Sequence, residues 1–334
     1  MSKKRVIILG STGSIGHQTL EVISTFPDRF EVTALTGYHN KNLLHQQIQN
    51  FRTIGYIGSK DILLWVVKNI PSDIVVVATV NGIGLDLAIE ALKSGRRVAM
   101  ADKEAVVLAG DLIMDVAKKH GSEIIPIDSE ASAIHQCLQG YDSSRVRRIF
   151  LTCSGGPFRN YTQEQLSQVT PETALKHPNW HMGKKVTIDS ASVVNKAFEV
   201  AEIHFLFGIP YEKIEVVIHP QSIVHSAVEF MDGSIIAQAA FPDMHLPIQY
   251  SLLYPERVDG FKISEIPFPL GLSFEKLQEG QFPAFDISLK ALKEGKNRDL
   301  VEADRKAVEL FLRGELKFNE IANFLKLKER TTIV

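Results

Sequence analysis

The chain has 334 residues, of which 45% are hydrophobic and 23% are charged, and its formal net charge is −2. This length suits two or three domains with sizeable cores, and the near-neutral charge disfavours a nucleic-acid or anionic-membrane partner. Cys137 and Cys153 show neither metal-type spacing nor a disulfide framework. No apolar run approaches the roughly 20 residues that span a bilayer. Because the basic N-terminus passes straight into a predicted strand, we expect a cytoplasmic protein.

The first predicted strand, 6–9, is followed by a glycine-rich turn at 10–16 and a helix through residue 26. Strand, glycine turn and helix form the context in which a G-x-x-G-x-x-G spacing indicates a dinucleotide site. The glycines let the backbone approach a pyrophosphate, and the helix N-terminus meets its charge. The alternative is an ordinary tight connection between strand and helix.

The second predicted strand, 31–36, ends where the adenosine ribose of a dinucleotide would lie. Proteins that prefer NAD carry an acidic residue there, whereas this chain has Tyr38, His39, Asn40 and Lys41. The missing carboxylate and the added cation favour NADP, because an acid would repel its 2′-phosphate. The alternative is that these residues are simply polar loop residues.

Strands and helices continue to alternate, with strands predicted at 54–57, 74–78 and 97–100 and helices from 62, over 85–93 and over 105–120. This alternation predicts an α/β fold with a doubly wound, Rossmann-type parallel sheet, whose ligands bind at the carboxyl ends of the strands. Asp102, Lys103 and Glu104 follow one such end. For each of these charges taken singly, helix capping is the alternative.

The run 124–127 predicts another buried strand, which ends in Asp128 and Glu130. If the chain stays extended there, both carboxylates point to one side, because side chains alternate with period two. Two like charges at a strand end make sense around a cation. The alternative is that Asp128 or Ser129 caps the helix predicted over 131–139.

A second acidic site lies on a helix predicted over 190–207, which is apolar almost all round and therefore buried. Asn195, Glu199 and Glu202 recur at i, i+4 and i+7 on one stripe, with Lys196 adjacent. A structural ion pair with Lys196 is the alternative. Together with Asp128 and Glu130, the carboxylate of Glu199 predicts an oxygen-ligand site for Mg²⁺ or Mn²⁺.

The remaining segments predict a different kind of domain. After a strand at 146–152, the backbone amides of 154–156 form a candidate phosphate cradle, with an ordinary turn as the alternative. The segment 177–184 mixes an aromatic ring, imidazoles and a lysine, as suits a lid. Strands at 214–219, 223–230 and 234–240 predict a mixed or antiparallel sheet whose exposed face would serve dimerisation. A linker at 255–283 and helices at 286–293 and 303–312 complete the chain.

These sites together indicate a reaction class. A hydride donor beside a Lewis-acid metal implies reduction of a carbonyl in a polyoxygenated substrate, and the anion cradle suggests that this substrate is phosphorylated. The metal would polarise the carbonyl and stabilise the alkoxide as it forms.

Seven segments then resemble one family in order. They are GSTGSIG at 10–16, DKE at 102–104, DSE at 128–130, SGGPF at 154–158, HPNWHMGKK at 177–185, DSA with NK and E over 189–199, and IHPQS at 218–222. This set resembles the 1-deoxy-D-xylulose 5-phosphate reductoisomerases, NADPH-dependent enzymes of the non-mevalonate isoprenoid pathway. The similarity covers residues 4 to about 255 well and the rest weakly.

The resemblance implies a metal-assisted rearrangement of the substrate, followed by NADPH reduction to 2-C-methyl-D-erythritol 4-phosphate. It also implies a homodimer. The expected domains are an NADPH-binding domain at 1–145, a catalytic, metal-binding and dimerisation domain at 146–255, a linker at 256–285 and a shortened C-terminal helical domain at 286–334. The competing hypotheses are a paralogue that binds NADP(H) or a sugar phosphate without turnover, and a plain NADP-dependent dehydrogenase.

Matching the motifs position by position implies a set of site residues. The implied metal ligands are Asp128, Glu130 and Glu199, and the residues that act beside them in catalysis are Lys103 and Glu202. The implied substrate contacts are Lys103, Ser129, Glu130, Ser154, His177, Trp180, Met182, Ser190, Asn195, Lys196, Glu199 and His219. Ser154, Ser190, Asn195 and Lys196 would hold the phosphate. The implied NADPH contacts are Gly10, Thr12, Gly13, Ser14, Ile15, His39, Asn40, Asp102, Glu104 and Gly183.

The chain departs from the family pattern at several positions. Asp102 stands where the family usually has Asn, Tyr38 where it has a small residue, and Ala131 where a histidine commonly follows DSE. The third-strand region is shortened, and the run 301–305 replaces an Asn-Ala-Ala-Asn-Glu-like sequence. These changes leave every implied metal and phosphate ligand in place, so they bear on efficiency and nucleotide affinity more than on reaction type.

Overall fold

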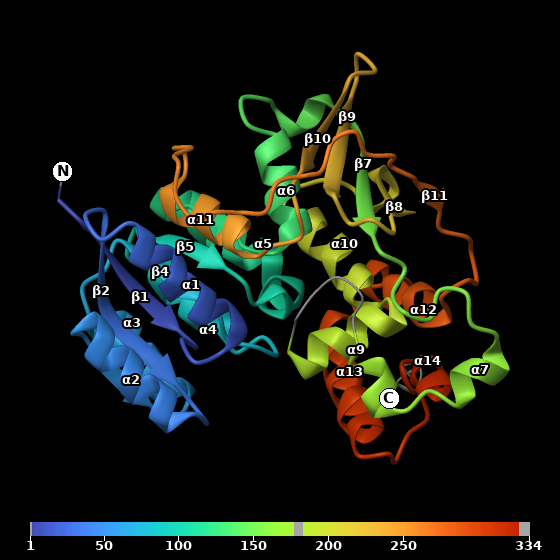
Figure 1. Ribbon diagram of the computed structural model, residues 1–334, viewed down its shortest axis with the longest axis horizontal. Helices are drawn as coiled ribbons and strands as arrows, with labels where there is room; N and C mark the ends of the chain where they lie inside the picture. Colours follow the sequence, from blue (N-terminus) through green and yellow to red (C-terminus); the bar gives the residue numbers. More distant parts are fainter. Residues whose placement is uncertain (1, 177–182, 327–334) are drawn as a thin grey trace, which may run out of the picture.

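The computed structural model describes residues 2–176 and 183–326 (Figure 1). Six strands form a parallel sheet, sheet A, in the order β3-β2-β1-β4-β5-β6. Their bounds are β1 Lys4–Leu9, β2 Phe30–Gly37, β3 Ile54–Ile57, β4 Ile74–Val77, β5 Arg97–Met100 and β6 Ile124–Pro126. Strand β4 is an Ile-Val-Val-Val run with all four residues buried, as expected where helices cover both faces of a sheet. The doubly wound sheet predicted from the sequence is confirmed.

Helices cover both faces of sheet A. They are α1 Ser14–Thr25, α2 Lys41–Phe51, α3 Lys60–Asn69, α4 Gly84–Lys93, α5 Lys103–His120 and, from the second half of the chain, α11 His245–Leu253. One face packs with α1, α2 and α11 and the other with α3, α4 and α5. Figure 1 shows α11 beside α1, although these two helices lie far apart in the sequence. The strand order reverses between β1 and β4, and doubly wound folds bind their ligands at such a switch point.

The second sheet, sheet B, has the order β10-β9-β7-β8-β11, with β7 and β8 parallel and the other pairs antiparallel. Its strands are β7 Val146–Cys153, β8 Ile214–Ile218, β9 Val224–Phe230, β10 Ile235–Ala239 and β11 Glu275–Lys276. The predicted mixed sheet is therefore confirmed. The helices of this half are α6 Ser129–Cys137, α7 Gln163–Ser167, α8 Pro171–Ala174, α9 Lys184–Ser192, α10 Val194–Phe207, α12 Pro283–Lys293, α13 Asn297–Leu312 and α14 Ile321–Phe324.

One apolar core joins sheet B to α10, α12 and α13. Helix α10 is buried along nearly its whole length, as its apolar sequence predicts. It also packs against α5, so it connects the two halves of the molecule. Among the described residues, no helix combines the length and the hydropathy needed to cross a bilayer.

The prediction of a single helix over 190–207 is wrong, because the chain forms two helices, α9 and α10, with a break at Val193. Val193 has a φ of 64°, a left-handed conformation that is costly for a β-branched residue. The sequence carries no glycine or proline there to signal a break. The side chain of Val193 is buried and lines the main cavity, so tertiary packing imposes the conformation.

Helix α5 approaches α10 closely because position 110 has no side chain. A Cβ atom on Gly110 would lie 2.3 Å from Cβ of Phe205 in α10. The preceding residue, Ala109, has non-helical backbone angles, so α5 is kinked at this contact. The close approach places the first turn of α5 against the middle of α10.

We predict that Gly110→Ala lowers the free energy of unfolding by about 1–3 kcal/mol, although alanine favours helices, because the added methyl group has no space. Urea unfolding followed by circular dichroism measures the change. Gly271→Ala is the matched control, since a Cβ there meets nothing within 4 Å. Equal stability of the two variants would contradict the packing argument.

Candidate active site

A cavity opens between the two halves of the molecule, and its empty space, counted out to the open solvent, is about 1130 Å³. Sheet A contributes Ala101 and Ile127, which follow the carboxyl ends of β5 and β6, and sheet B contributes Thr152 and Val224. Ser14 and Ile15, in the first turn of α1, also line the cavity. The cavity therefore extends from the glycine turn to sheet B.

Three carboxylates meet in this cavity. One oxygen from each of Asp128, Glu130 and Glu199 lies within 4.8 Å of the others. The extended geometry expected for the first two residues is wrong, because β6 ends at Pro126 and α6 begins at Ser129. The first turn of α6, rather than strand alternation, places them on one side. The carboxylate of Asp128 makes no capping hydrogen bond, so helix capping does not account for it.

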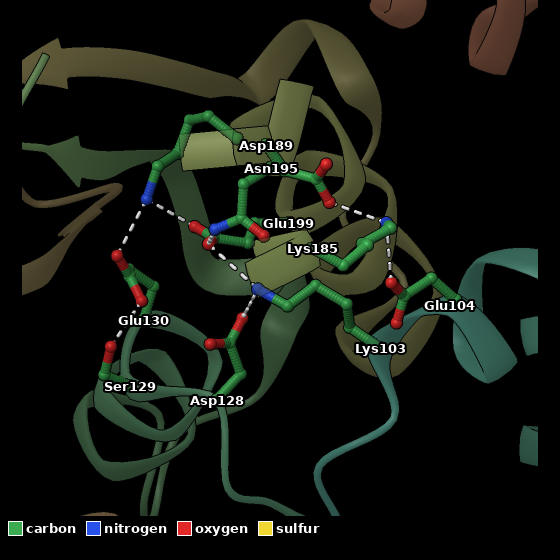
Figure 2. A network of polar contacts seen from close by, with 10 residues as sticks. Lys103, Glu104, Asp128, Ser129, Glu130, Lys185, Asp189, Asn195 and Glu199 are labelled. Atoms are coloured by element: carbon green, nitrogen blue, oxygen red, sulfur yellow. Dashed lines mark hydrogen bonds and ion pairs between the residues drawn. The ribbon is translucent and has the colours of Figure 1, made fainter. Parts of the chain in front are cut away.

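Two buried lysines separate these carboxylates (Figure 2). Lys103 Nζ lies 2.7 Å from Asp128 Oδ2 and 3.0 Å from Glu199 Oε1. Lys196 Nζ lies 2.7 Å from Glu130 Oε1 and also contacts Glu199 Oε2. Each lysine thus joins the first turn of α6 to α10, and each neutralises charge that burial would otherwise make costly.

The protonation of these acids follows from their neighbours. Burial alone would raise the pKa of Glu130, but Lys196 and Lys103 outweigh it and lower the pKa to about 2. Burial and the charge of Glu130 raise the pKa of Glu199 to about 7. Burial, followed by Asp128, raises the pKa of Glu202 well above its ordinary value. The site therefore holds one strongly ionised acid beside two that favour a proton.

The residues expected to bind phosphate lie on one wall of the cavity. Ser154, Ser190, Asn195 and Lys196 all line it. The hydroxyl of Ser154 accepts a hydrogen bond from the backbone N–H of Gly156 at 3.2 Å. Both Gly155 and Gly156 have positive φ, of 80° and 69°, so this turn depends on glycine. Ser129 also lines the cavity and donates a hydrogen bond to Glu130.

His219 borders the cavity, but its ring is held by hydrogen bonds within the protein. Its Nδ1 lies 2.8 Å from the carbonyl of Ser273, and its Nε2 accepts from the backbone N–H groups of Ile223 and Val224. Its ring stacks on Phe274 at 4.5 Å between centroids. This pattern requires the neutral tautomer protonated at Nδ1 and shapes the turn between β8 and β9.

Family models match most of the chain. The 1-deoxy-D-xylulose 5-phosphate reductoisomerase model matches residues 6–62 and 53–110, the C-terminal domain model of that enzyme matches 124–207, and the DXP reductoisomerase C-terminal domain model matches 240–328. A reductoisomerase of this name from Pelotomaculum thermopropionicum is 45% identical, over 97% of this chain and 90% of that protein. The chain belongs to the 1-deoxy-D-xylulose 5-phosphate reductoisomerase family.

Further members of the family are similar to this chain in sequence and in structure. The protein of this name from Caldanaerobacter subterraneus is also 45% identical, over 97% of this chain and 91% of its own length. The Zymomonas mobilis reductoisomerase in complex with NADPH superposes with a TM-score of 0.89 at 34% identity, covering 97% of this chain and 90% of that one. A reductoisomerase in complex with NADPH, fosmidomycin and magnesium superposes with a TM-score of 0.90 at 35% identity, covering 98% and 90%.

The residues expected to contact NADPH in this reductoisomerase lie in several places. Gly10, Thr12 and Gly13 form the turn between β1 and α1, and a Cβ on Gly10 would lie 2.5 Å from the carbonyl oxygen of Ala78. His39 and Asn40 follow β2, outside the cavity lining, and the side chain of Asn40 caps α2. Gly183 lines the cavity, whereas the Glu104 carboxylate is buried against Lys185. His177, Trp180 and Met182 lie outside the described residues.

Asp102, the departure from the family pattern, has a structural role that its sequence position did not reveal. Its carboxylate accepts hydrogen bonds from Thr79 Oγ1 and from the backbone N–H groups of Gly82, Gly84 and Ala105. It therefore caps α5 and holds the turn after β4, which borders the switch point of sheet A. Burial, followed by the charge of Glu104, raises the pKa of Asp102 to about 6.

Several cavity residues were missed from the sequence. Cys153, Ser222, His225 and Met244 all line the cavity. His225 lies in β9, where the burial pattern leaves no exposed residue, so strand alternation carried no signal for it. Met244 precedes α11, which packs against sheet A although it follows strands of sheet B in the sequence.

The pKa of Asp102 predicts how stability depends on pH. Because the pKa of Asp102 is higher in the folded protein than in the unfolded chain, the contribution of Asp102 to stability falls as pH rises from about 4 to about 6. The free energy of unfolding of wild type minus that of Asp102→Asn should therefore fall by about 2–3 kcal/mol over that range. Urea unfolding at four pH values measures it, and a constant difference would contradict the assignment.

Proposed function

We propose that this chain is an NADPH- and divalent-metal-dependent reductoisomerase, which rearranges 1-deoxy-D-xylulose 5-phosphate and reduces the product to 2-C-methyl-D-erythritol 4-phosphate. The observation that carries the proposal is the convergence of Asp128, Glu130 and Glu199 in a cavity that also reaches the glycine turn at Ser14. A non-catalytic paralogue is not favoured, since the altered positions leave the three acids and both lysines in place.

The three acids fit a hard divalent cation. All the ligand atoms are oxygens, they lie within 4.8 Å of one another, and they are largely removed from water. Asp128, Glu130 and Glu199 would hold Mg²⁺ or Mn²⁺. The cation would supply a Lewis acid that polarises the substrate carbonyl. With a cation held there, Lys103 and Lys196 would no longer need to neutralise these acids and would be available to substrate oxygens.

The other cavity residues divide the work of binding. Ser154, Ser190, Asn195 and Lys196 offer hydroxyl, amide and ammonium donors to the substrate phosphate. Lys103 and Ser129 also line the cavity, and we place the carbon chain of the substrate beside them, with Glu202 and His219 as supporting groups. His177, Trp180 and Met182, which lie outside the described residues, are proposed as further substrate contacts.

NADPH supplies the hydride in this proposal. The turn formed by Gly10, Thr12, Gly13, Ser14 and Ile15 would bind its pyrophosphate at the N-terminus of α1. The residues after β2, His39 and Asn40, would lie near the 2′-phosphate, since the chain offers no carboxylate there. Gly183, which lines the cavity, is proposed to lie at the nicotinamide end, and Asp102 and Glu104 would support it from behind the cavity lining.

The test is NADPH oxidation at 340 nm with 1-deoxy-D-xylulose 5-phosphate and Mn²⁺. We expect turnover that EDTA abolishes, and a loss of about 10²–10³-fold in kcat for Glu130→Gln, because one metal ligand loses its charge. Glu164→Gln, on the exposed face of α7, is the matched control and should retain full activity. Turnover that persists in EDTA would overturn the proposal.

We also propose a cytoplasmic homodimer. Strand β10 is an edge of sheet B, and Met231, Ile235 and Phe241 near it are exposed apolar residues. A second copy of the chain would cover them. Both cysteines are free thiols, as suits a reducing compartment.

Light scattering after size exclusion should give twice the mass of one chain, and Ile235→Lys should shift the protein toward the monomer. Lys68→Glu, on the distant helix α3, is the control for a change of surface charge. A wild-type protein that elutes as a monomer at micromolar concentration would rule the dimer out.

A further inference from the structure

A second buried cluster lies behind the wall of the cavity and centres on Lys185. Its Nζ lies 2.8 Å from Glu104 Oε1, 2.6 Å from Asp189 Oδ2 and 2.8 Å from Asp304 Oδ2. The side chains of these three acids are 9%, 1% and 1% exposed. Figure 2 shows Lys185 between Asp189 and Glu104, beside the cluster around Lys103.

The partners of Lys185 come from three helices. Glu104 is in the first turn of α5, Asp189 is one turn further along α9, and Asp304 is in the middle of α13. These helices belong to the three predicted domains of the chain. One ammonium group therefore joins three parts of the molecule: α5 beside sheet A, α9 before α10, and α13 among the C-terminal helices.

Two members of this cluster, Glu104 and Asp189, are next in sequence to residues that line the cavity. Glu104 directly follows Lys103, and Asp189 directly precedes Ser190. Gly183 and Val186 of the same stretch also line the cavity, whereas the four members of the cluster do not. Helix α9 thus presents one face to the cavity and uses the other face to hold its position.

The charges make Lys185 difficult to replace. Burial would lower the pKa of Lys185, but Asp189, Asp304 and Glu104 outweigh it and raise the pKa well above its ordinary value. Burial and the charge of Asp304 raise the pKa of Asp189. Without the ammonium group, three acids would face one another away from water, and they would take up protons or move apart, which loosens the contact between the helices.

We propose that Lys185 is a positioning residue, whose ammonium group fixes α9 against α5 and α13 and so sets the separation of Ser190 and Lys103 across the cavity. The proposal rests on the proposed function, since those two side chains are taken to bind the substrate. A shift of about 1 Å between substrate-holding groups can lower catalysis about 10²-fold. The effect should appear mainly in KM for the phosphorylated substrate.

The experiment compares Lys185→Met, which keeps the aliphatic stem, with Lys118→Met, an exposed lysine in the last turn of α5. We expect KM for 1-deoxy-D-xylulose 5-phosphate to rise about 10- to 100-fold in Lys185→Met and to stay within about twofold in Lys118→Met. Adding Asp304→Asn to Lys185→Met should recover part of the loss, because one repelling charge is removed. If Lys185→Met acted only by disturbing packing, adding Asp304→Asn, which changes charge but not shape, would not relieve the loss.

The outcomes separate the two proposals. No turnover by wild type overturns the proposed function. An active wild type with equal KM in the two lysine variants overturns the positioning role, and so does a loss that Asp304→Asn fails to relieve. If Lys185→Met does not fold by circular dichroism, Glu104→Gln, which keeps the ammonium group, provides the comparison. A substrate KM within about twofold of wild type in Glu104→Gln would then overturn the positioning role.

Discussion

The structure depends on holding several carboxylates together where water is scarce. Asp128, Glu130 and Glu199 repel one another, and their convergence persists because Lys103 and Lys196 lie between them. The fold concentrates these charges by bringing the first turns of α5 and α6 against the middle of α10. Without a compensating cation, such a cluster would take up protons or move apart. In the proposed function, holding the three acids together in advance would give a divalent metal a set of ligands that is already assembled.

The same physical arrangement occurs a second time behind the cavity. Lys185 holds three acids from three helices, as Lys103 and Lys196 hold acids from two. The first cluster opens into the cavity, where the proposed metal ion would replace the lysines as the compensating charge. The second does not line the cavity, so it remains a tie between helices. Asp102 adds a third device, in which backbone N–H groups instead of a lysine satisfy a buried carboxylate.

Sequence patterns predicted the features that depend on local order. The alternation of strands and helices led to the parallel sheet, and acids that follow strand ends led to Asp128 and Glu130. The features that depend on distant contacts were not predictable. The break at Val193 has no glycine or proline signal, the donors to Asp102 lie in the turn after β4, and Lys185 meets its partners only after three helices have packed. The extended geometry expected for Asp128 and Glu130 was wrong because β6 ends at Pro126 and α6 begins at Ser129, although the two residues do come together.

The proposed metal site is the cluster of Asp128, Glu130 and Glu199 that Lys103 and Lys196 hold together. A crystal of the protein grown with Mn²⁺ and measured at the manganese absorption edge tests it most directly. We predict a single strong anomalous peak among the carboxylate oxygens of Asp128, Glu130 and Glu199, which disappears in Glu130→Gln. A peak elsewhere, with both lysines still bound to these three acids, would contradict the account.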